Sequence, residues 1–329
     1  MNQPSVGAGW LSPSRAWRLI ECPASVQPVA GNGPGAATDQ EVNTGTLAHR
    51  ALERWIRAEG YRAGDPKAAL AEAADACAAE LPGGPPSSWR VSRARLVARG
   101  MSLVDLIGQR MPAQVLSEVK LQDDDLRLRG QLDLLLLGDD IVVVDLKTQT
   151  LLDEGLPEWV QFQLTLYAHL IEKIYGDLPA RVEVFSLNRG RIDVPITKET
   201  LRDARGALAM ARAANPSHAK PSREACQFCA RRLECEPHWE VAMRWRNTDA
   251  LEGAVVRVEE ATTGVAAVLL EGLAGRAWAS GIPTDLIAAA TPGQMLRLVR
   301  VHHVGVGADR VALWRWRRLS AGGVGTLSE

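Results

Sequence analysis

The stretch Gly130–Lys147, GQLDLLLLGDDIVVVDLK, governs how this chain folds. Its two apolar runs, Leu134–Leu137 and Ile141–Val144, flank the turn Gly138–Asp140, and this pattern predicts a β-hairpin. Because both runs are apolar at every position, both faces of the sheet are expected to be covered by helices. The hairpin is therefore predicted to lie inside an α/β fold.

Charged side chains stand at the rim of this hairpin. Asp133 begins the first strand, and Asp145, Leu146 and Lys147 end the second. Because side chains alternate along a strand, Asp145 and Lys147 share one face while Leu146 points to the other. Two carboxylates and an ammonium at the edge of a dry sheet are costly unless they are paired or bind a metal.

On the hairpin alone, two interpretations of these charges stay open. They are either ordinary charges where a strand reaches the surface, or a divalent-metal site for phosphodiester hydrolysis. In the second case Asp133 and Asp145 hold the ion and the Leu146 carbonyl adds a ligand. Lys147 would then position water or stabilise developing negative charge. Glu118, on a strand expected before the hairpin, is a further candidate for approaching the metal.

Composition narrows the class of protein. The 329 residues leave room for two domains, each with its own core. A formal net charge of -1 gives no global signal for nucleic acid, so any such surface must be local. The chain has neither a stretch of about 18 uncharged apolar residues nor a basic-then-apolar N-terminus, which predicts a soluble, cytoplasmic protein without membrane contact.

Periodicity and capping residues predict elements along most of the chain. The expected helices cover residues 10–26, 45–60, 67–80, 89–109, 157–175 and 197–214, and the expected strands outside the hairpin cover 115–121, 182–187 and 191–195. Ser12 is the predicted N-cap of the first helix. The fourth helix carries several arginines, which mark either a solvated face or a groove for backbone phosphates: Arg90, Arg93, Arg95 and Arg99.

Polar side chains on two of these helices are candidates for the site. His49 lies near the apolar stripe of the second helix, where a lone histidine is more often structural than a ligand. Gln163 and Tyr167, at i and i+4 on the fifth helix, suit a hydrogen-bonding pair beside a cleft. Gln161 and His169 are the competing polar positions on that helix.

The spacing Cys226-x2-Cys229-x5-Cys235 predicts a metal site. In a reducing compartment, three thiols so close together favour metal binding over a disulfide framework. The fourth ligand stays open. His238 would complete a zinc knuckle from local ligands. Cys22 would instead close a four-cysteine iron–sulfur cluster that joins the N-terminus to the end of the domain.

The combined pattern resembles the RecB-like nucleases of the PD-(D/E)XK superfamily, over roughly residues 10–240. The motifs that match in order and spacing are His49, Gly130-x-x-Asp133, Asp145-x-Lys147 and Gln163-x-x-x-Tyr167. The cysteines resemble those of the cluster-bearing branch, which includes the CRISPR-associated RecB-like exonucleases and the nuclease domain of AddB; they are Cys22, Cys226, Cys229 and Cys235.

The resemblance implies a metal-dependent DNA exonuclease that acts on single-stranded ends. It also implies Mg2+ or Mn2+ at the site, a structural 4Fe-4S cluster, and a central mixed sheet flanked by helices. The implied site residues are the metal ligands His49, Asp133 and Asp145, the catalytic lysine Lys147, and Gln163 and Tyr167, which contact DNA or organise the site. Asp145 departs from the pattern, because the superfamily often has Glu there.

Residues 251–319 change character, into short β-rich segments separated by Gly-rich turns. Five predicted strands, with a short helix near Thr284–Ala290 after the third, resemble an OB-fold barrel. The chain then divides into a nuclease domain at 1–240, a linker at 241–250, the OB-like domain, and a tail at 320–329. The alternative is a small β-domain used for dimerisation or stability.

Aromatic and basic residues alternate on the last two predicted strands. Because bases stack on rings while guanidinium groups meet phosphates, this pattern favours single-strand binding. The residues are Arg297, Arg300, Trp314, Arg315, Trp316 and Arg317. A period of two puts the two tryptophans on one face and Arg315 and Arg317 on the other, and which face is the core stays open.

Two functional hypotheses from different classes follow. The first is a cluster-containing DNA exonuclease whose C-terminal barrel holds the strand. The second is a non-catalytic or accessory DNA-binding module of a repair, recombination, phage-related or CRISPR-related complex, with Zn2+ in place of the cluster. The intact motifs favour the first.

Overall fold

The computed structural model describes residues 9–27, 44–151, 155–227, 229–273, 275–307, 309–316 and 324–326. These residues form two compact units. The first contains the described residues up to Ile20 and those from 44 to Ala214, and the second contains those from Glu21 to 27 and from Asn215 onward. The predicted boundary near residue 240 therefore lies inside the second unit, which also holds the cysteine segment.

The first unit is built on a five-stranded mixed sheet. Its strands are β1 (Gln114–Asp123), β2 (Leu128–Leu137), β3 (Ile141–Lys147), β4 (Arg181–Ser186) and β5 (Gly190–Asp193), in the order β1-β2-β3-β4-β5. β3 and β4 are parallel, and the other neighbours are antiparallel. The predicted hairpin is confirmed, with Leu134 opposite Val144 and Leu137 opposite Ile141.

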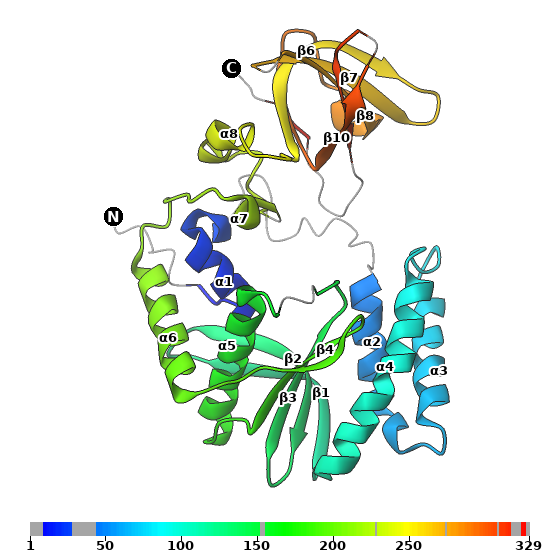
Figure 1. Cartoon of the computed structure of the whole chain (residues 1–329), viewed down its shortest axis with the longest axis vertical. Helices are drawn as coiled ribbons and strands as arrows, with labels where there is room; N and C mark the ends of the chain where they lie inside the picture. Colours follow the sequence, from blue (N-terminus) through cyan, green and yellow to red (C-terminus); the bar gives the residue numbers. More distant parts are fainter. Residues whose placement is uncertain are drawn as a thin grey trace. The chain divides into compact units, whose positions relative to one another are not determined.

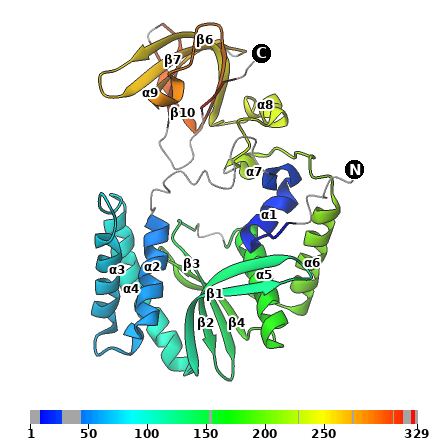
Figure 2. The ribbon, with the colours of Figure 1, turned by 180° about the vertical axis from the view of Figure 1, so that it is seen from behind.

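Helices cover both faces of this sheet, as the unbroken apolar runs predicted (Figures 1 and 2). One face carries α2 (Thr44–Arg57), α3 (Pro66–Ala79) and α4 (Trp89–Arg110), and the other carries α5 (Glu158–Tyr175) and α6 (Lys198–Ala213). Alternate hairpin residues such as Leu134, Val144 and Leu146 pack into the core with α2, α3 and α4. The mixed α/β fold class is therefore confirmed.

The N-terminal helix α1 (Pro13–Glu21) begins where its cap predicted. Ser12 Oγ accepts a hydrogen bond of 3.3 Å from the N–H of Arg15, so one otherwise unpaired donor of the first turn is satisfied. Two short 3-10 turns, Pro23–Val26 and Gly60–Arg62, follow α1 and α2. None of the helices in the described ranges is apolar over a length that would cross a bilayer.

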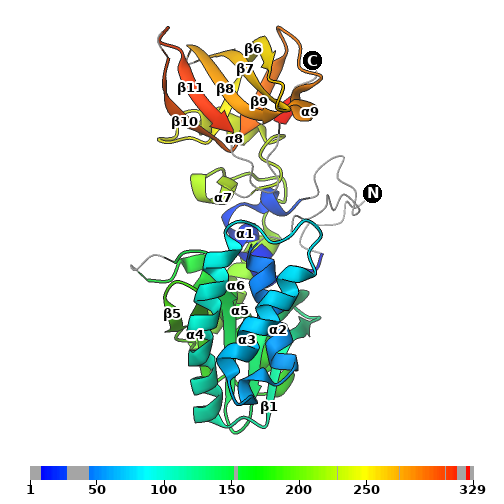
Figure 3. The same ribbon diagram turned by 90° about the vertical axis from the view of Figure 1, so that its right-hand side faces the viewer.

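The second unit is mostly β-structure. It contains the short helices α7 (Arg223–Gln227), α8 (Glu236–Ala242) and α9 (Thr284–Ile287), and the strands β6 (Ala250–Glu260), β7 (Val265–Gly272), β8 (Gly275–Pro283), β9 (Met295–Val299), β10 (Val301–Val306), β11 (Ala312–Trp316) and β12 (Val324–Thr326). The strands lie in the order β10-β11-β8-β7-β6-β9-β12 (Figure 3). The predicted short helix after the third strand corresponds to α9.

The fourth predicted strand of this unit is split in two. Arg300, with a φ of 65°, separates β9 from β10, because a positive φ bends an extended chain sharply. β9 pairs with β6 and β10 pairs with β11, which in turn runs parallel to β8. The two halves of one predicted strand therefore pair with opposite ends of the β6-β7-β8-β11 sheet. Of the predicted tail at 320–329, residues 324–326 form β12 and the others lie outside the described residues.

Candidate functional site

Three side chains that can bind a metal meet in the first unit, from three separate elements. His49 comes from α2, Glu118 from β1 and Asp133 from β2, and one ligand atom of each lies within 4.8 Å of the others. His49 Nδ1 is 2.7 Å from Asp133 Oδ1 and 4.0 Å from Glu118 Oε1. Two carboxylates and an imidazole at this spacing suit a divalent cation.

The group carries surplus negative charge. Burial lowers the pKa of His49, but the hydrogen bond and charge of Asp133 outweigh burial and hold that pKa above its usual value. The charges of Asp145 and Glu118 act in the same direction. Burial, followed by the charge of Asp133, raises the pKa of Glu118. A bound divalent cation would relieve the repulsion between these carboxylates.

The backbone of β1 is distorted where Glu118 faces Asp133. Glu118 has a φ of 53°, and the pairing of β1 with β2 is interrupted at this residue. A non-glycine residue in the left-handed region costs about 1–3 kcal/mol and persists only when its surroundings hold it there. The Gln131 side chain on β2 donates a hydrogen bond to Glu118 Oε2 and so anchors the carboxylate.

Asp145 and Lys147 form a charged pair at the end of β3. Asp145 is 4% exposed, and Lys147 Nζ lies 2.7 Å from Asp145 Oδ2. This contact lacks the alignment of a hydrogen bond, so among the described residues that buried oxygen has no hydrogen-bond donor. Burial raises the pKa of Asp145 despite the opposing charge of Lys147. Lys147 Nζ also donates a hydrogen bond of 3.0 Å to Gln163 Oε1.

Leu146 links the two aspartates through its backbone. Its N–H donates a hydrogen bond of 2.6 Å to Asp133 Oδ2. Its side chain is buried in the core on the opposite face from Asp145 and Lys147, which the alternation along the strand predicted. The role of the Leu146 carbonyl as a metal ligand stays a prediction.

Tyr167 of α5 lies directly against β2. Its hydroxyl donates a hydrogen bond of 2.8 Å to the carbonyl oxygen of Gln131. A Cβ placed on Gly130 would come 2.6 Å from Tyr167 Cε1, so only glycine lets the ring approach the strand this closely. Gln163 and Tyr167 thus support Lys147 and β2 from the same helix, and Gly130 explains why the motif begins with a glycine.

A model of a known protein family matches the part of the chain that forms this site. The model of the PD-(D/E)XK nuclease superfamily matches residues 10–236, which include every element of the site described above. This chain belongs to the PD-(D/E)XK nuclease superfamily. Membership indicates a nuclease, and nucleases of this superfamily use divalent metals, in agreement with the His49, Glu118 and Asp133 group.

Two solved structures are similar to this PD-(D/E)XK chain at low identity. The protein SSO0001 is 16% identical with a TM-score of 0.29, over 61% of this chain and 87% of that chain. A candidate exonuclease from Eubacterium rectale is 13% identical with a TM-score of 0.30, over 65% of this chain and 93% of that chain. No curated protein matches. The assignment therefore depends on the family model alone.

Two residues of the PD-(D/E)XK site were missed in the sequence. Gln131, which holds Glu118, lies two positions before Asp133, so the alternation along β2 could have placed it on the same face. Trp159 has its ring 5.4 Å from Lys147 Nζ, a cation–π contact. It precedes Gln163 by one helical turn, and that spacing could have placed it beside Gln163.

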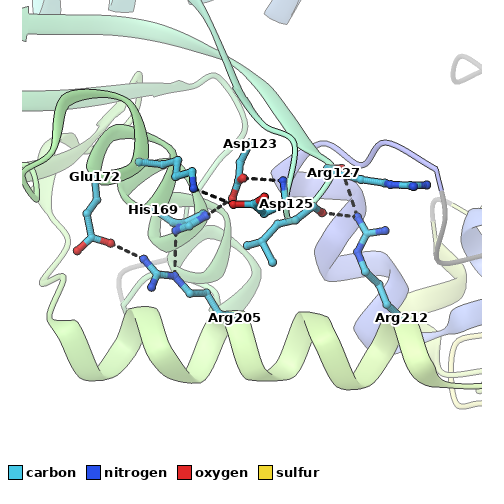
Figure 4. Close-up of polar contacts among 9 residues, drawn as sticks. Asp123, Asp125, Arg127, His169, Glu172, Arg205 and Arg212 are labelled. Carbon is cyan, nitrogen blue, oxygen red and sulfur yellow. Dashed lines mark hydrogen bonds and ion pairs between the residues drawn. The ribbon is translucent and has the colours of Figure 1, made fainter.

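The competing polar residues of α5 have other partners, and Figure 4 shows those of His169. Gln161 Nε2 donates a hydrogen bond of 2.8 Å to the carbonyl of Leu156. His169 Nε2 lies 2.7 Å from Asp123 Oδ2, and His169 Nδ1 accepts a hydrogen bond of 2.9 Å from Arg205. In this structure the polar groups of Gln161 and His169 therefore have partners other than Lys147 and the His49 group.

The predicted cluster cysteines line one cavity of about 280 Å³ in the second unit: Cys22, Cys226, Cys229 and Cys235. The N–H of Lys220 donates a hydrogen bond of 3.3 Å to Cys22 Sγ, and Arg231 donates one of 3.2 Å to the carbonyl of Ala24. These contacts attach the segment after α1 to the segment before α8. Burial, followed by the neighbouring thiols, raises the pKa of Cys226 to about 12.

His238 lines the same cavity and packs against two tryptophans. It is 0% exposed, and among the described residues neither ring nitrogen has a hydrogen-bond partner. Its ring makes edge contacts with Trp239 and Trp245, at centroid distances of 5.2 and 5.3 Å. Burial lowers the pKa of His238 to about 4, so the ring is neutral at physiological pH.

On β11 the tryptophans face the core and Arg315 is exposed, which is one of the two alternatives that the sequence left open, whereas Arg297 of β9 is buried. Arg297 is 4% exposed and bound to Glu236 and Glu252 at 2.7 Å each. Trp316 is buried in the core, and Trp314 packs against that core. Burial and ion pairing therefore remove Arg297 and Trp316 from an exposed binding face.

The other predicted nucleic-acid contacts differ in exposure. Arg315 is exposed, whereas Arg300 is half-buried at the bend between β9 and β10. Burial lowers the pKa of Arg300. Arg317 lies outside the described residues. Of the predicted set, Arg315 is thus the residue best placed to meet a phosphate.

Proposed function

We propose that this protein is a metal-dependent exonuclease that hydrolyses phosphodiester bonds at single-stranded DNA ends, with Mg2+ or Mn2+ as the metal. The observation that carries the proposal is the group of His49, Glu118 and Asp133, with Asp145 and Lys147 beside it, in a chain of a nuclease superfamily. The surplus negative charge of this group fits a divalent cation.

The residues of the site divide the chemistry between them. A bound divalent cation would activate water and neutralise charge on the phosphate. Asp133, Asp145 and His49 would hold it, with Glu118 as a further ligand. Lys147 Nζ, fixed by Asp145 and Gln163, is placed to orient a water or to stabilise the charge that develops on the phosphate oxygens.

Removal of the catalytic groups tests this function. We expect Lys147→Ala and Asp145→Ala each to lower Mg2+- or Mn2+-dependent cleavage of end-labelled single-stranded DNA by at least about a hundredfold, roughly 2.7 kcal/mol of barrier. Lys173→Ala is the matched control. Lys173, on α5, is ion-paired with an aspartate as Lys147 is, but its partner is the exposed Asp125. Circular single strands should resist cleavage. Undiminished cleavage by Lys147→Ala would favour the accessory DNA-binding hypothesis or another site.

We also propose that the cysteine cavity holds a structural 4Fe-4S cluster ligated by Cys22, Cys226, Cys229 and Cys235. Cys22 is close enough for its charge to raise the pKa of both Cys226 and Cys235. Four thiols that line one cavity offer a complete ligand set for a metal centre, and binding one would release their protons. The cluster would join the segment after α1 to the segment before α8.

The spacing of the thiols favours the cluster over zinc. Ligand sulfurs of one zinc ion lie at most about 4.6 Å apart, twice the Zn–S distance. Among the described residues, no three of the cysteine and histidine ligand atoms at this cavity lie within 4.8 Å of one another. A four-iron cluster holds its cysteines farther apart, because the iron–sulfur cube stands between them.

The absorption spectrum of anaerobically purified protein tests the cluster. We expect a broad brown visible band that Cys22→Ser bleaches. Cys77→Ser is the matched control, because Cys77 is the one cysteine outside the cavity and is buried in the α2–α4 core. His238→Ala should keep the band. A colourless wild-type protein that contains zinc would disprove the cluster.

We further propose that the second unit is an OB-like barrel that holds a single DNA strand. The pairing of β9 with β6 and of β10 with β11, and the parallel β8–β11 pair, support a closed five-strand barrel. Trp278, Leu269 and Leu313 lie side by side on β8, β7 and β11. Arg257 lies over the Trp278 ring at 5.3 Å. Such a surface offers stacking and a cation to successive nucleotides.

A further inference from the structure

A groove runs along α4, outside the residues assigned to the metal site. It has a volume of about 690 Å³ and lies between one face of α4 and the segment Leu187–Asn188. That segment joins β4 to β5, and β5 lies alongside α4 (Figure 3). All of these elements belong to the first unit.

The helix side of the groove combines arginines with small residues. Arg90, Arg95 and Arg99 line it and are exposed. Ala94 and Ala98 lie between them on the same helix face. Because the alanine side chains are small, they leave room above the floor of the groove for the arginine side chains. The α4 groove therefore presents a row of cations above a shallow apolar floor.

These cations lack a counter-charge. None of the described residues that line the groove is a carboxylate. Within the part of the chain that the structure describes, Arg90 and Arg95 form no ion pair or hydrogen bond. Arg93, on the same helix, instead donates two hydrogen bonds of 2.6 Å to Asp75 on α3. Arg99, the third groove arginine, donates a hydrogen bond of 3.4 Å to the carbonyl oxygen of Asn188. The α4 helix thus separates the ion-paired Arg93 from Arg90 and Arg95 in the groove.

Two contacts place the α4 groove next to the metal site. The N–H of Leu187 donates a hydrogen bond of 3.1 Å to the carbonyl oxygen of Lys147. The hydroxyls of Ser88 and Thr44, 2.6 Å apart, join the start of α4 to the start of α2, the helix that carries His49. Both contacts join the groove to an element that carries a residue of the metal site. A polymer bound at Lys147 and His49 would therefore pass close to the groove.

We propose that the α4 groove binds the sugar–phosphate backbone of the DNA strand beside the scissile bond, an inference that rests on the nuclease function proposed above. Guanidinium groups bind phosphates through paired N–H donors. Val91, 53% exposed between Arg90 and Arg95, offers apolar contact to a sugar or base. The arginines read charge and not sequence, so binding here depends on the number of phosphates engaged.

The salt dependence of binding tests the groove. The double variant Arg90→Gln/Arg95→Gln is compared with wild type by fluorescence anisotropy of a labelled single-stranded oligonucleotide, in EDTA and over a range of salt concentrations. We expect about tenfold weaker binding and a slope of log K against log salt that is smaller by about 1.4, because each phosphate contact contributes about 0.7 for single strands. Arg93→Gln, the matched control, should keep the wild-type slope. Arg95→Lys should also keep it, because the charge remains.

The binding measurement needs no cleavage, so it separates this proposal from the nuclease function. A wild-type slope in the double variant, with metal-dependent cleavage by wild type, would overturn the groove and leave the nuclease function standing. A smaller slope in the double variant, with no cleavage by wild type, would support the groove and overturn the nuclease function. A slope reduced equally by Arg93→Gln would also overturn the groove, because any arginine of α4 would then have the same effect.

Discussion

Two histidine–aspartate pairs in the first unit have the same contact distance and opposite surroundings. His49 lies 2.7 Å from Asp133, and His169 lies 2.7 Å from Asp123. The His49 side chain is 34% exposed, and Glu118 stands beside it, so carboxylates exceed cations. The His169 side chain is 7% exposed, and Arg205 donates to its second nitrogen.

The difference shows what makes a histidine a candidate ligand. At His169 every charged group has a protein partner: Arg205 pairs with Glu172, Lys173 pairs with Asp125, and His169 contacts Asp123 (Figure 4). This network attaches the β1–β2 turn to α5 and α6, so it stabilises the fold. At His49 the ligand atoms of Glu118 and Asp133 lie close enough to the imidazole for the three to share one ion, so this group can take its partner from solution. Distance alone does not distinguish the two pairs.

The largest effect should come from His49→Ala. We expect metal-dependent cleavage to fall by about a hundredfold or more, because the group loses its nitrogen ligand. The free energy of unfolding without metal should change by less than about 1 kcal/mol, since removal of a half-exposed side chain leaves no cavity. Cleavage assays and urea unfolding in EDTA measure the two quantities. A large loss of stability with full activity would reverse the roles assigned to the two pairs.

His169→Ala should show the opposite profile. We expect a loss of about 3 kcal/mol in the free energy of unfolding, because Asp123 and Arg205 lose their buried partner. Cleavage per folded molecule and metal affinity should stay within about twofold of wild type. Urea unfolding and calorimetric Mn2+ titration provide the readouts. Metal affinity that falls with His169→Ala would contradict the separation of the two networks.

The smallest expected effect concerns Asp123 and the free energy of unfolding at acidic pH. Burial acts to raise the pKa of Asp123. The hydrogen bond from His169 and backbone hydrogen bonds outweigh burial and hold that pKa below its usual value. The resulting stabilisation is complete above the unfolded pKa, about 3.9, and is lost as pH falls below it. Asp123→Asn should therefore flatten the fall in stability between about pH 4 and pH 3. Unfolding at several pH values, with Asp140→Asn as an exposed control, tests this expectation; parallel curves for Asp123→Asn and wild type would contradict it.

Much of the fold was readable from local pattern. Helix and strand periods placed the other strands of the first sheet within a few residues, and Ser12 marked the start of α1. The first hairpin strand was placed too late, because β2 begins at Leu128 and not at Asp133. The unbroken apolar runs of the hairpin required cover on both faces, because apolar side chains on either face must be removed from water. Alternation along β3 also placed Asp145 and Lys147 on one face and Leu146 on the other.

The tertiary structure alone decided which polar groups meet. Nothing local distinguishes His49 from His169, or Arg93 from Arg95, because their meaning depends on partners from distant elements. The same holds for Arg297, which an alternating pattern marked as exposed but which Glu236 and Glu252 bury.

Sequence by itself thus determined the mixed α/β core and the residues at the end of its central hairpin, because backbone geometry repeats with a fixed period that side chains must follow. Only the tertiary structure decided that Gln131 of that hairpin holds the Glu118 carboxylate beside Asp133, and that one strand of the second unit bends at Arg300. The physical reason is that charge balance and burial are properties of a place in three dimensions, to which several distant segments contribute at once.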